Sequence, residues 1–378
     1  MRSGSGMRLD AVTSLGMVTN LGRDARTVCA AARAGISRLT PITGFTAFDP
    51  DVLEVPVIGA PIVGITEGFA ATGGFVRLGE AALVDLIRYG GLPAIEDRGF
   101  WQRTGLVWCL PEITVERFMW PEEEVAEILQ IACAERLSDV SGVALAVFPG
   151  GQVPLGHVGA ATALSRIDQL AQEAGVERLV LLATDSYLDD MALRLLLDEG
   201  RVKSAERPTG LIPGEAGAAI LLEPSATSSS KCGAQCRIVA VAVLDASQPL
   251  DDEDVSAARR AMAVSVGRNL ATVVGTVIEQ LNGDSFEGTV FLDLNGEEWK
   301  AVAWGVALTQ LQGLMNLDHS TLEYPCVSFG EIGAASAVAA LCLGARAFVK
   351  GYSVGDRALV LSIGDRGQVS AILLQSAR

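Results

Sequence analysis

Short apolar runs rich in β-branched residues recur along the chain, and turn-forming residues bound each of them. Such runs are typical of strands buried in a sheet. They predict strands at 9–15, 143–148, 178–183, 218–222, 238–244, 289–294, 358–363 and 369–374. Apolar residues three and four positions apart predict helices at 24–34, 122–135, 160–174, 257–281, 299–315 and 333–343. Strands that alternate with helices indicate an α/β protein with buried mixed sheets.

The composition indicates an interior of small aliphatic residues, because 49% of the residues are hydrophobic, only 5% are aromatic and 41 are glycine. A chain of 378 residues is long enough for two domains of ordinary size. The Ser-, Thr- and Cys-containing segment 225–236 is the predicted boundary between an N-terminal half at 8–235 and a C-terminal half at 236–378. Residues 1–7 repeat Ser and Gly before a second Met, and we expect them to be a non-native leader.

The charge balance argues against a nucleic-acid partner. Asp and Glu number 45 against 29 Lys and Arg, which gives a net charge of −16, whereas phosphate binding needs clustered Lys and Arg. No uninterrupted apolar stretch reaches the roughly 18 to 20 residues of a membrane-spanning helix. The start, MRSGSGM, lacks the apolar core of a secretion signal, and seven cysteines without framework spacing indicate reduced thiols. We therefore expect a cytoplasmic protein that binds neither nucleic acid nor membrane.

The sequence also predicts no cofactor and no metal. His157 and His319 are the only histidines, which disfavours a His-based metal site. The sequence has no Walker loop, no Rossmann glycine motif and no Gly-x-Ser-x-Gly elbow. The Gly-rich run 214–218 precedes a strand, so we interpret it as a site of close packing. Cys232 and Cys236 are the only close pair of cysteines, and a surface disulfide or metal clip remains an alternative to free thiols there.

Residues 13–37 read TSLGMVTNLGRDARTVCAAARAGIS, a strand, a Gly-bracketed turn and a helix that resemble the opening of β-ketoacyl synthases. Further segments resemble this family in the same order: PTGLIPGEAGAAILLEP at 208–224, RIVAVAVLDAS at 237–247, FLDLNGEEW at 291–299, SFGEIGAASAVAAL at 328–341 and LSIGDRGQVSAILL at 361–374. The resemblance covers most of the chain apart from a divergent insertion near 40–125. It implies the thiolase-like fold, in which two similar halves form a five-layered αβαβα arrangement and usually pair as a homodimer.

The resemblance also implies a Cys nucleophile at a helix N-terminus, where backbone N–H groups and the helix dipole favour a thiolate. The turn that should carry this nucleophile falls within 154–164, where Val158 or Gly159 takes its position. Neither residue can attack a thioester. His157 is adjacent and leaves two interpretations open: a nucleophilic histidine, or a structural histidine that bonds backbone or water.

Two further family residues, commonly His, polarise the thioester carbonyl, and both are replaced here. Asn295-Gly296 stands at the first His-Gly, and Asn can donate a hydrogen bond but cannot act as an acid or base. Phe329-Gly330 stands at the second Gly-His. Glu331 follows, and we interpret it as a carboxylate at a helix N-terminus, with a general base as the alternative.

With all three reactive positions substituted, the sequence predicts a non-catalytic ketosynthase-like protein that acts as a binding, partner or chaperone-like subunit. The resemblance suggests two kinds of protein partner. One is a ketosynthase-like subunit, as in chain-length-factor heterodimers of biosynthetic gene clusters, and the other is a secreted effector of a type VI secretion gene cluster. The alternative hypothesis is an acyltransferase, or another enzyme acting on acyl thioesters, that uses a remodelled pocket with His157, Asn295 or Cys326. Cys326 is otherwise interpreted as a buried structural thiol.

Arg194, Arg201, Lys203 and Arg207 form the best candidate basic patch for docking an acidic acyl carrier protein. Acidic residues are interspersed throughout 189–206, so we interpret the segment as a solvated, salt-bridged helix end and loop. The sequence therefore predicts weak or absent binding to a carrier protein.

Overall fold

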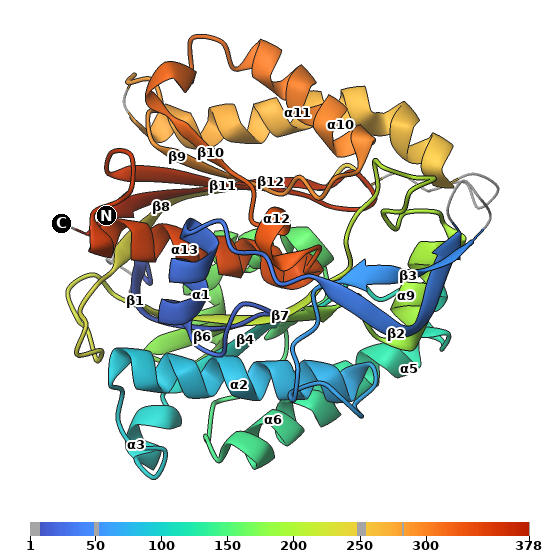
Figure 1. The fold of residues 1–378 in the computed structure, drawn as a ribbon. Helices are drawn as coiled ribbons and strands as arrows, with labels where there is room; N and C mark the ends of the chain where they lie inside the picture. The colour runs from blue at the N-terminus through green and yellow to red at the C-terminus, as the bar shows by residue number, and fades with distance from the viewer. Residues whose placement is uncertain (1–7, 49–52, 248–254, 282, 378) are drawn as a thin grey trace.

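The framework of the molecule is a ten-stranded sheet that divides into two five-stranded parts of the same topology, which we call the first and second sheets (Figure 1). The computed structural model describes residues 8–48, 53–247, 255–281 and 283–377, so the predicted leader 1–7 lies outside the described residues. The first sheet has the order β1 (Ala11–Val18), β7 (Glu215–Glu223), β6 (Arg178–Ser186), β4 (Thr104–Cys109) and β5 (Gln152–Val153). The second has the order β8 (Cys236–Leu244), β12 (Val369–Ser376), β11 (Arg357–Ile363), β9 (Thr289–Leu292) and β10 (Thr321–Glu323).

The strand directions repeat from one sheet to the other. In each sheet the first three strands are antiparallel to their neighbours, and the last two continue in parallel to the third. In the described chain the two sheets are joined by the pairing of β1 with β8, in which Ala11 is opposite Arg237 and Val12 is opposite Cys236. This internal duplication confirms the predicted fold class of two similar halves.

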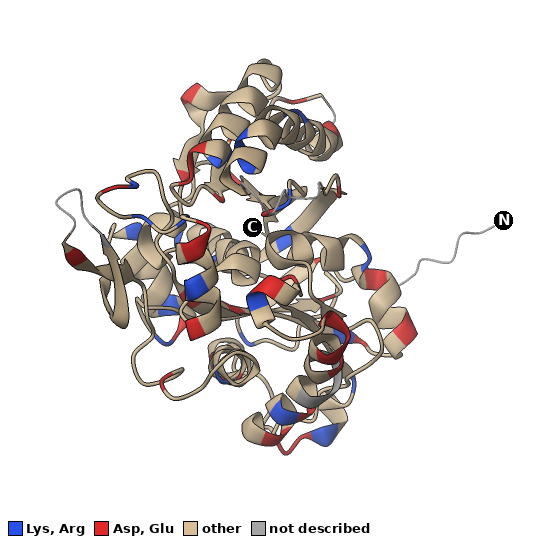
Figure 2. Ribbon diagram, turned by 90° about the vertical axis from the view of Figure 1, so that its right-hand side faces the viewer, with Lys and Arg blue, Asp and Glu red and all other residues tan. Residues whose placement is uncertain are grey.

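Helices fill the space between the sheets and cover both outer faces, which gives five layers (Figure 1). The middle layer holds α1 (Ala25–Arg33), α7 (Gly159–Ser165), α8 (Ile167–Ala174), α12 (Cys326–Phe329) and α13 (Ser336–Lys350). The first sheet is covered by α2 (Thr72–Gly90), α3 (Arg98–Trp101), α5 (Glu122–Glu127) and α6 (Ala134–Ser141). The second sheet is covered by α10 (Val255–Ile278) and α11 (Glu298–Gln310). Basic positions lie among acidic ones on the helices that face the viewer in Figure 2.

Two helices of the described chain, Val255–Leu281 and Gly333–Lys350, are long and apolar enough to cross a membrane by length and composition alone. Their most apolar windows are 56% and 72% buried inside the fold. Such burial is typical of core helices, and α13 is apolar on both sides because it packs between two sheets.

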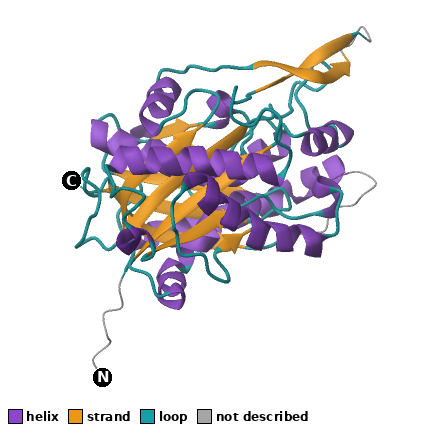
Figure 3. Cartoon of the chain, turned by 90° about the horizontal axis from the view of Figure 1, so that it is seen from below, coloured by secondary structure: helices purple, strands orange, loops and turns teal. Residues whose placement is uncertain are grey.

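A separate hairpin of β2 (Thr40–Phe48) and β3 (Glu54–Gly59) projects from the body (Figure 3). It packs on α9 (Asp190–Asp198), where Val57 joins Leu193 and Leu196 in a small apolar cluster. Together with α4 (Val115–Phe118), α9 borders the site described below.

Two expectations of local structure were wrong. The predicted strand 143–148 is irregular, and only Ala146 forms an isolated bridge, to Gly105, because Pro149 and Gly150 turn the chain directly afterwards. The edge strand is β5 instead. The helix predicted at 160–174 is broken at Arg166, whereas the chain is helical throughout the predicted helix 122–135, with a π-helical segment at Ile128–Cys133. The segment 40–125, left without assigned elements, holds the central strand β4 and the long helix α2.

Close approach of α2 to the first sheet depends on glycine. A Cβ atom at Gly16 of β1 would overlap the carbonyl oxygen of Ala82 in α2. We predict that Gly16→Ala lowers the free energy of unfolding by about 2–3 kcal/mol, because backbone would have to shift in a packed core. The control is Gly305→Ala in α11, where a Cβ meets nothing within 4 Å and helix propensity adds up to about 1 kcal/mol. Denaturant titration measures both, and equal stabilities of the two variants would contradict this packing.

Candidate functional site

A cleft of about 950 Å³ opens where the chain leaves the carboxyl ends of β4, β6 and β11. Its walls include Arg117 after β4, Tyr187 after β6 and Asp365 after β11. His157 lies at its floor. Ligand sites of α/β proteins commonly lie at the carboxyl ends of parallel strands. This cleft is therefore the candidate site.

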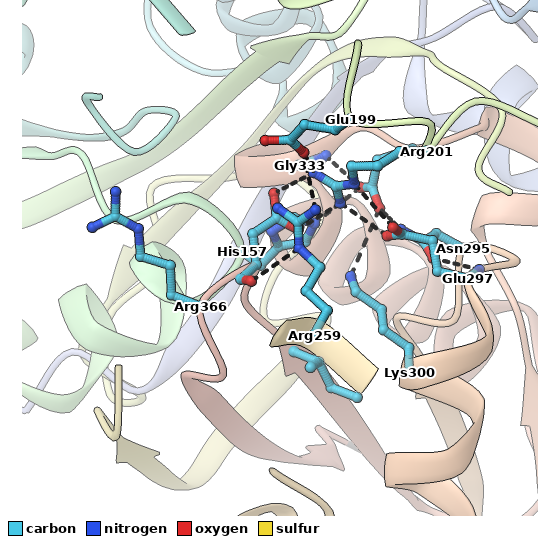
Figure 4. Close-up of polar contacts among 12 residues, drawn as sticks. His157, Glu199, Arg201, Arg259, Asn295, Glu297, Lys300, Gly333 and Arg366 are labelled. Carbon is cyan, nitrogen blue, oxygen red and sulfur yellow. Dashed lines mark hydrogen bonds and ion pairs between the residues drawn. The ribbon is translucent and has the colours of Figure 1, made fainter. Parts of the chain in front are cut away.

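Beneath the floor lies a buried group of charges that we call the inner cluster: His157, Asp293, Lys300 and Glu331 (Figure 4 shows His157 and Lys300). His157 Nε2 lies 3.0 Å from Glu331 Oε1 and 3.8 Å from Asp293 Oδ2. Lys300 Nζ lies 3.5 Å from Asp293 Oδ2 and 3.8 Å from Glu331 Oε2. Two cations thus face two carboxylates in a region that solvent scarcely reaches.

The duplicated fold positions the central ion pair. His157 belongs to a 3₁₀ turn, Gly156–Val158, that leads into α7, and Glu331 precedes the corresponding turn, Gly333–Ala335, that leads into α13. The backbone of Glu331 bonds to Ile212 and Gly214, just before β7. A Cβ at Gly214 would overlap the carbonyl oxygen of Phe329, so the Gly-rich run here serves close packing as predicted.

A second group of charges, the outer cluster, surrounds the first: Glu199, Arg201, Arg259, Glu297 and Asp365. Arg201 donates two hydrogen bonds of 2.9 Å to Glu297 and two, of 2.8 and 3.1 Å, to Asp365. Arg259 pairs with Glu199 at 2.9 Å. Asn295 joins the clusters, because its amide nitrogen donates to Glu297 at 2.9 Å and to Glu331 at 2.6 Å.

The protonation states follow from this pairing. Burial and the nearby Lys300 disfavour a charged His157, but Asp293 and Glu331 outweigh them and raise its pKa to about 9. Burial alone would raise the pKa of Glu331, yet His157 and Lys300 hold it well below its usual range. Burial raises the pKa of Asp293 in spite of Lys300. Together the two clusters place four basic side chains beside five acidic ones.

Two backbone N–H groups just before α13 donate hydrogen bonds to carboxylates of the chain itself. The N–H of Gly333 donates to Glu331 Oε1 at 2.8 Å, and the N–H of Ala334 donates to Asp185 Oδ2 at 2.8 Å. Asp185 is paired with Arg117 as well. Donors that could otherwise stabilise an anion in the site are therefore already used.

His157, Asp293 and Glu331 each offer one ligand atom within 4.8 Å of the others, which is a spacing that a metal ion could use. The residues present do not fit a metal, however. Lys300 places an ammonium group beside both carboxylates, and the Nε2 atom of His157 is already hydrogen-bonded to Glu331. A divalent ion would have to displace one cation and deprotonate another.

The structure brings together His157, Asn295 and Glu331 among the predicted site residues. Val158 and Phe329 are buried apolar side chains, and Gly159 begins α7. Gly296 and Gly330 have φ angles of +102° and +70°, so each supplies a turn that favours glycine.

Sequence reasoning missed Asp293, Lys300 and the inward position of Arg201. The signal for Lys300 was its place on the apolar face of α11, beside the buried Ala303, Trp304 and Ala307. Assigning Arg201 to a surface patch was wrong. It is 6% exposed, because the chain turns back at Gly200 after α9 and directs the guanidinium toward Glu297.

The candidate cysteines are buried or lie apart from the cleft floor. Cys326 is buried with its Sγ 3.9 Å from Asp293 Oδ1, and burial raises the pKa of its thiol well above the usual value. Cys232 and Cys236 are both free thiols; Cys232 is exposed, whereas burial raises the pKa of Cys236 to about 12.

No family model and no curated protein sequence matches the chain. Among solved structures it is similar to a type II polyketide ketosynthase in complex with its acyl carrier protein, at 11% identity over 98% of this chain and 100% of that chain, with a TM-score of 0.72. An oxazolomycin ketosynthase domain from Streptomyces albus JA3453 is 13% identical over 98% and 74%, with a TM-score of 0.73. The ishigamide ketosynthase/chain length factor is 16% identical over 98% and 99%, with a TM-score of 0.67. The chain therefore has the thiolase-like fold.

The raised pKa of His157 predicts a pH-dependent contribution to stability. Because the folded-state pKa lies above the model-peptide value of 6.5, the stabilisation is fully present below about pH 6.5 and is lost as the pH rises toward 9. We expect the difference in unfolding free energy between the wild type and His157→Gln to shrink over this interval, measured by urea titration at pH 6, 7.5 and 9. A difference that stays constant or grows with pH would contradict the pairing of His157 with Glu331.

Proposed function

We propose that this chain is a non-condensing, ketosynthase-like subunit whose role is to bind a partner of the same fold. The observation that carries the proposal is the charge-paired inner cluster, which fills the position where the resemblance expects a reactive thiolate and its activating histidines. A cluster whose members are all engaged with one another has no free nucleophile and no free base.

The position of the nucleophile supports this. Val158 and Gly159 carry no reactive atom, and Cys109, which packs beside Gly159, is fully buried, so burial raises the pKa of its thiol far above neutrality. A thiol that stays protonated does not attack a thioester. Cys326 is disfavoured for the same reason, which weakens the alternative hypothesis of an acyltransferase.

Carbonyl activation lacks donors too. Both hydrogens of the Asn295 amide are directed at carboxylates, and the backbone donors of Gly333 and Ala334 are taken by Glu331 and Asp185. Stabilising an oxyanion needs preorganised donors that are free to meet it.

The edge of the first sheet supports a subunit role. β5 has only two residues and pairs with β4 on one side. Just before β5, the backbone N–H of Trp108 donates to the carbonyl oxygen of Gly151. No strand of the described chain pairs with its other side. Val147 and Leu155 flank this edge with 43% and 40% of their surfaces exposed. Unpaired edges with apolar flanks favour pairing with a second subunit, and the relatives in solved structures include a ketosynthase/chain length factor.

We predict no release of carbon dioxide from malonyl-CoA or a malonyl carrier protein, and no covalent adduct after incubation with acyl-CoA. The reason is the absence of a free thiolate and of free oxyanion donors at the cleft floor. Radiometric detection of carbon dioxide and intact-protein mass spectrometry measure the two reactions, with an active ketosynthase as the positive control. Turnover above a protein-free blank would refute the proposed function.

We also predict that the isolated chain forms a two-fold dimer through the β5 edge at micromolar concentration. Val147→Lys should shift the chain toward monomer, because it places a charge in the apolar contact. Val354→Lys is the matched control, since Val354 is 42% exposed but lies in the loop before β11, away from β5. Sedimentation analysis measures the mass of each variant. A monomeric wild type, or equal effects of the two variants, would count against this interface.

A further inference from the structure

Six basic side chains gather at the end of the molecule opposite the cleft, and we call this group the basic end. The cleft opens at the carboxyl ends of β4 and β11. α13 ends shortly before β11 begins, and α2 ends before the segment 91–103 that leads to β4. Both helices therefore end near the amino ends of these strands. The basic end consists of Arg26, Arg33, Arg88, Lys231, Arg346 and Lys350.

Contacts with two tyrosines bring the arginines of this group together. The Cζ atoms of Arg26 and Arg346 lie 5.0 and 5.5 Å from the ring centroid of Tyr89, in the last turn of α2. The Cζ atom of Arg33 lies 3.9 Å from the ring centroid of Tyr352, whose N–H donates to the last turn of α13. The ends of α1, α2 and α13 thus form one positively charged surface.

The remaining members join the same surface. The backbone N–H of Lys231 donates to the carbonyl oxygen of Gly90, the last residue of α2, at 2.7 Å. Arg88 and Lys350 lie in the last turns of α2 and α13. Arg346 is half-buried, and the other five basic side chains are exposed.

The charge of the basic end is not neutralised by the described part of the chain. None of its members forms an ion pair with an acidic side chain there, whereas Arg201 and Arg259 at the cleft are both paired. Asp24 lies nearby but is engaged as the N-cap of α1. Three helix C-termini supply about 1.5 negative charges, which is well short of six positive ones.

The two guanidinium groups at Tyr89 are held in place for binding an anion. Arg346 donates to the Tyr89 hydroxyl at 3.0 Å, and Arg26 donates to the Tyr89 carbonyl oxygen at 3.3 Å. A guanidinium has five N–H donors, so each group keeps donors beyond these bonds. Fixed guanidinium groups match the two oxygens of a carboxylate and lose little freedom when they bind it.

The net charge of the whole chain limits the size of the anion. The chain carries −16, so an extended anionic surface such as a membrane or a nucleic acid would face acidic regions beyond the basic end. Attraction between exposed charges is screened beyond about 8 to 10 Å in physiological salt. A short acidic segment meets the basic end alone and avoids that repulsion.

We propose that the basic end is a docking surface for a short acidic segment of a partner protein, whose Asp or Glu carboxylates pair with Arg26, Arg346 and the cations around them. The proposal goes beyond the non-condensing role and does not depend on it. It uses no residue of the β5 edge, and a partner held at the amino ends of the strands leaves the cleft open.

The test is fluorescence anisotropy of a labelled peptide of alternating Glu and Ser, titrated with the full chain. We expect a dissociation constant on the order of 10–100 μM at about 50 mM NaCl, and binding about tenfold weaker at about 300 mM. The same peptide with Gln in place of Glu should not bind. Absence of binding at about 0.5 mM protein, or binding that does not change with salt, would overturn the proposal.

Charge-reversal variants locate the binding. The double variant Arg33→Glu/Lys350→Glu changes two exposed ends of helices and should weaken binding about tenfold or more. Its matched control is Arg260→Glu/Arg268→Glu, which changes the net charge equally at exposed positions of α10 and should weaken binding less than about threefold. Equal losses in the two double variants would overturn the proposal.

A milder variant guards against loss of folding. Lys231→Gln removes one exposed charge in a loop and should weaken binding about twofold to threefold. Unchanged affinity in this variant and in Arg33→Glu/Lys350→Glu would count against the basic end.

A final comparison distinguishes an acidic segment from other polyanions. Vesicles that contain phosphatidylserine and duplex DNA should bind more weakly than the Glu-Ser peptide at the same salt. Binding of either one without binding of the peptide would overturn the acidic-segment proposal. None of these outcomes bears on the non-condensing role, which carbon dioxide release and acyl-adduct formation test separately.

Discussion

Burial of the Glu331 carboxylate is the constraint on which the rest of the site depends. A charge removed from water must be paired and hydrogen-bonded, and removal of one partner from such a pair costs about 3–5 kcal/mol. Glu331 meets this demand with His157, Lys300, Asn295 and the N–H of Gly333. Those partners come from both halves of the chain, so the same interactions that satisfy one carboxylate also join the two halves.

The duplicated architecture explains why this happens at the cleft floor. The turns that lead into α7 and α13 meet there, and the loops that follow β9 and β11 end beside them. Helix N-termini at the carboxyl ends of strands usually make an anion site. In this chain, Glu331 and Asp185 already supply the anions. The backbone donors at the start of α13 are thus bonded to carboxylates of the chain itself.

The sequence was sufficient to predict the arrangement of strands and helices, but it was insufficient to predict the inner and outer clusters of charged residues. Alternating apolar runs predicted most of the strands, and the order of segments such as 208–224 and 328–341 predicted the thiolase-like fold. Local patterns failed where tertiary contacts determine the secondary structure. The apolar run 143–148 predicted a strand, but a turn directly after it leaves only an isolated bridge. β4 lies in a segment for which the sequence pattern predicted no strand. Arg201 and Glu297 are 96 residues apart, so no local pattern could pair them. Lys300 was visible only as a charge on an apolar helix face.

The central claim is that His157 lines the cleft as a protonated imidazole that is paired with Glu331. Its most direct test is the ¹⁵N spectrum of the two histidine side chains as a function of pH in the absence of ligand, because His319 gives an exposed reference in the same sample. The account predicts that both ring nitrogens of His157 remain protonated at pH 8. A His157 that loses its proton near pH 6.5, as an imidazole in a short peptide does, would contradict it.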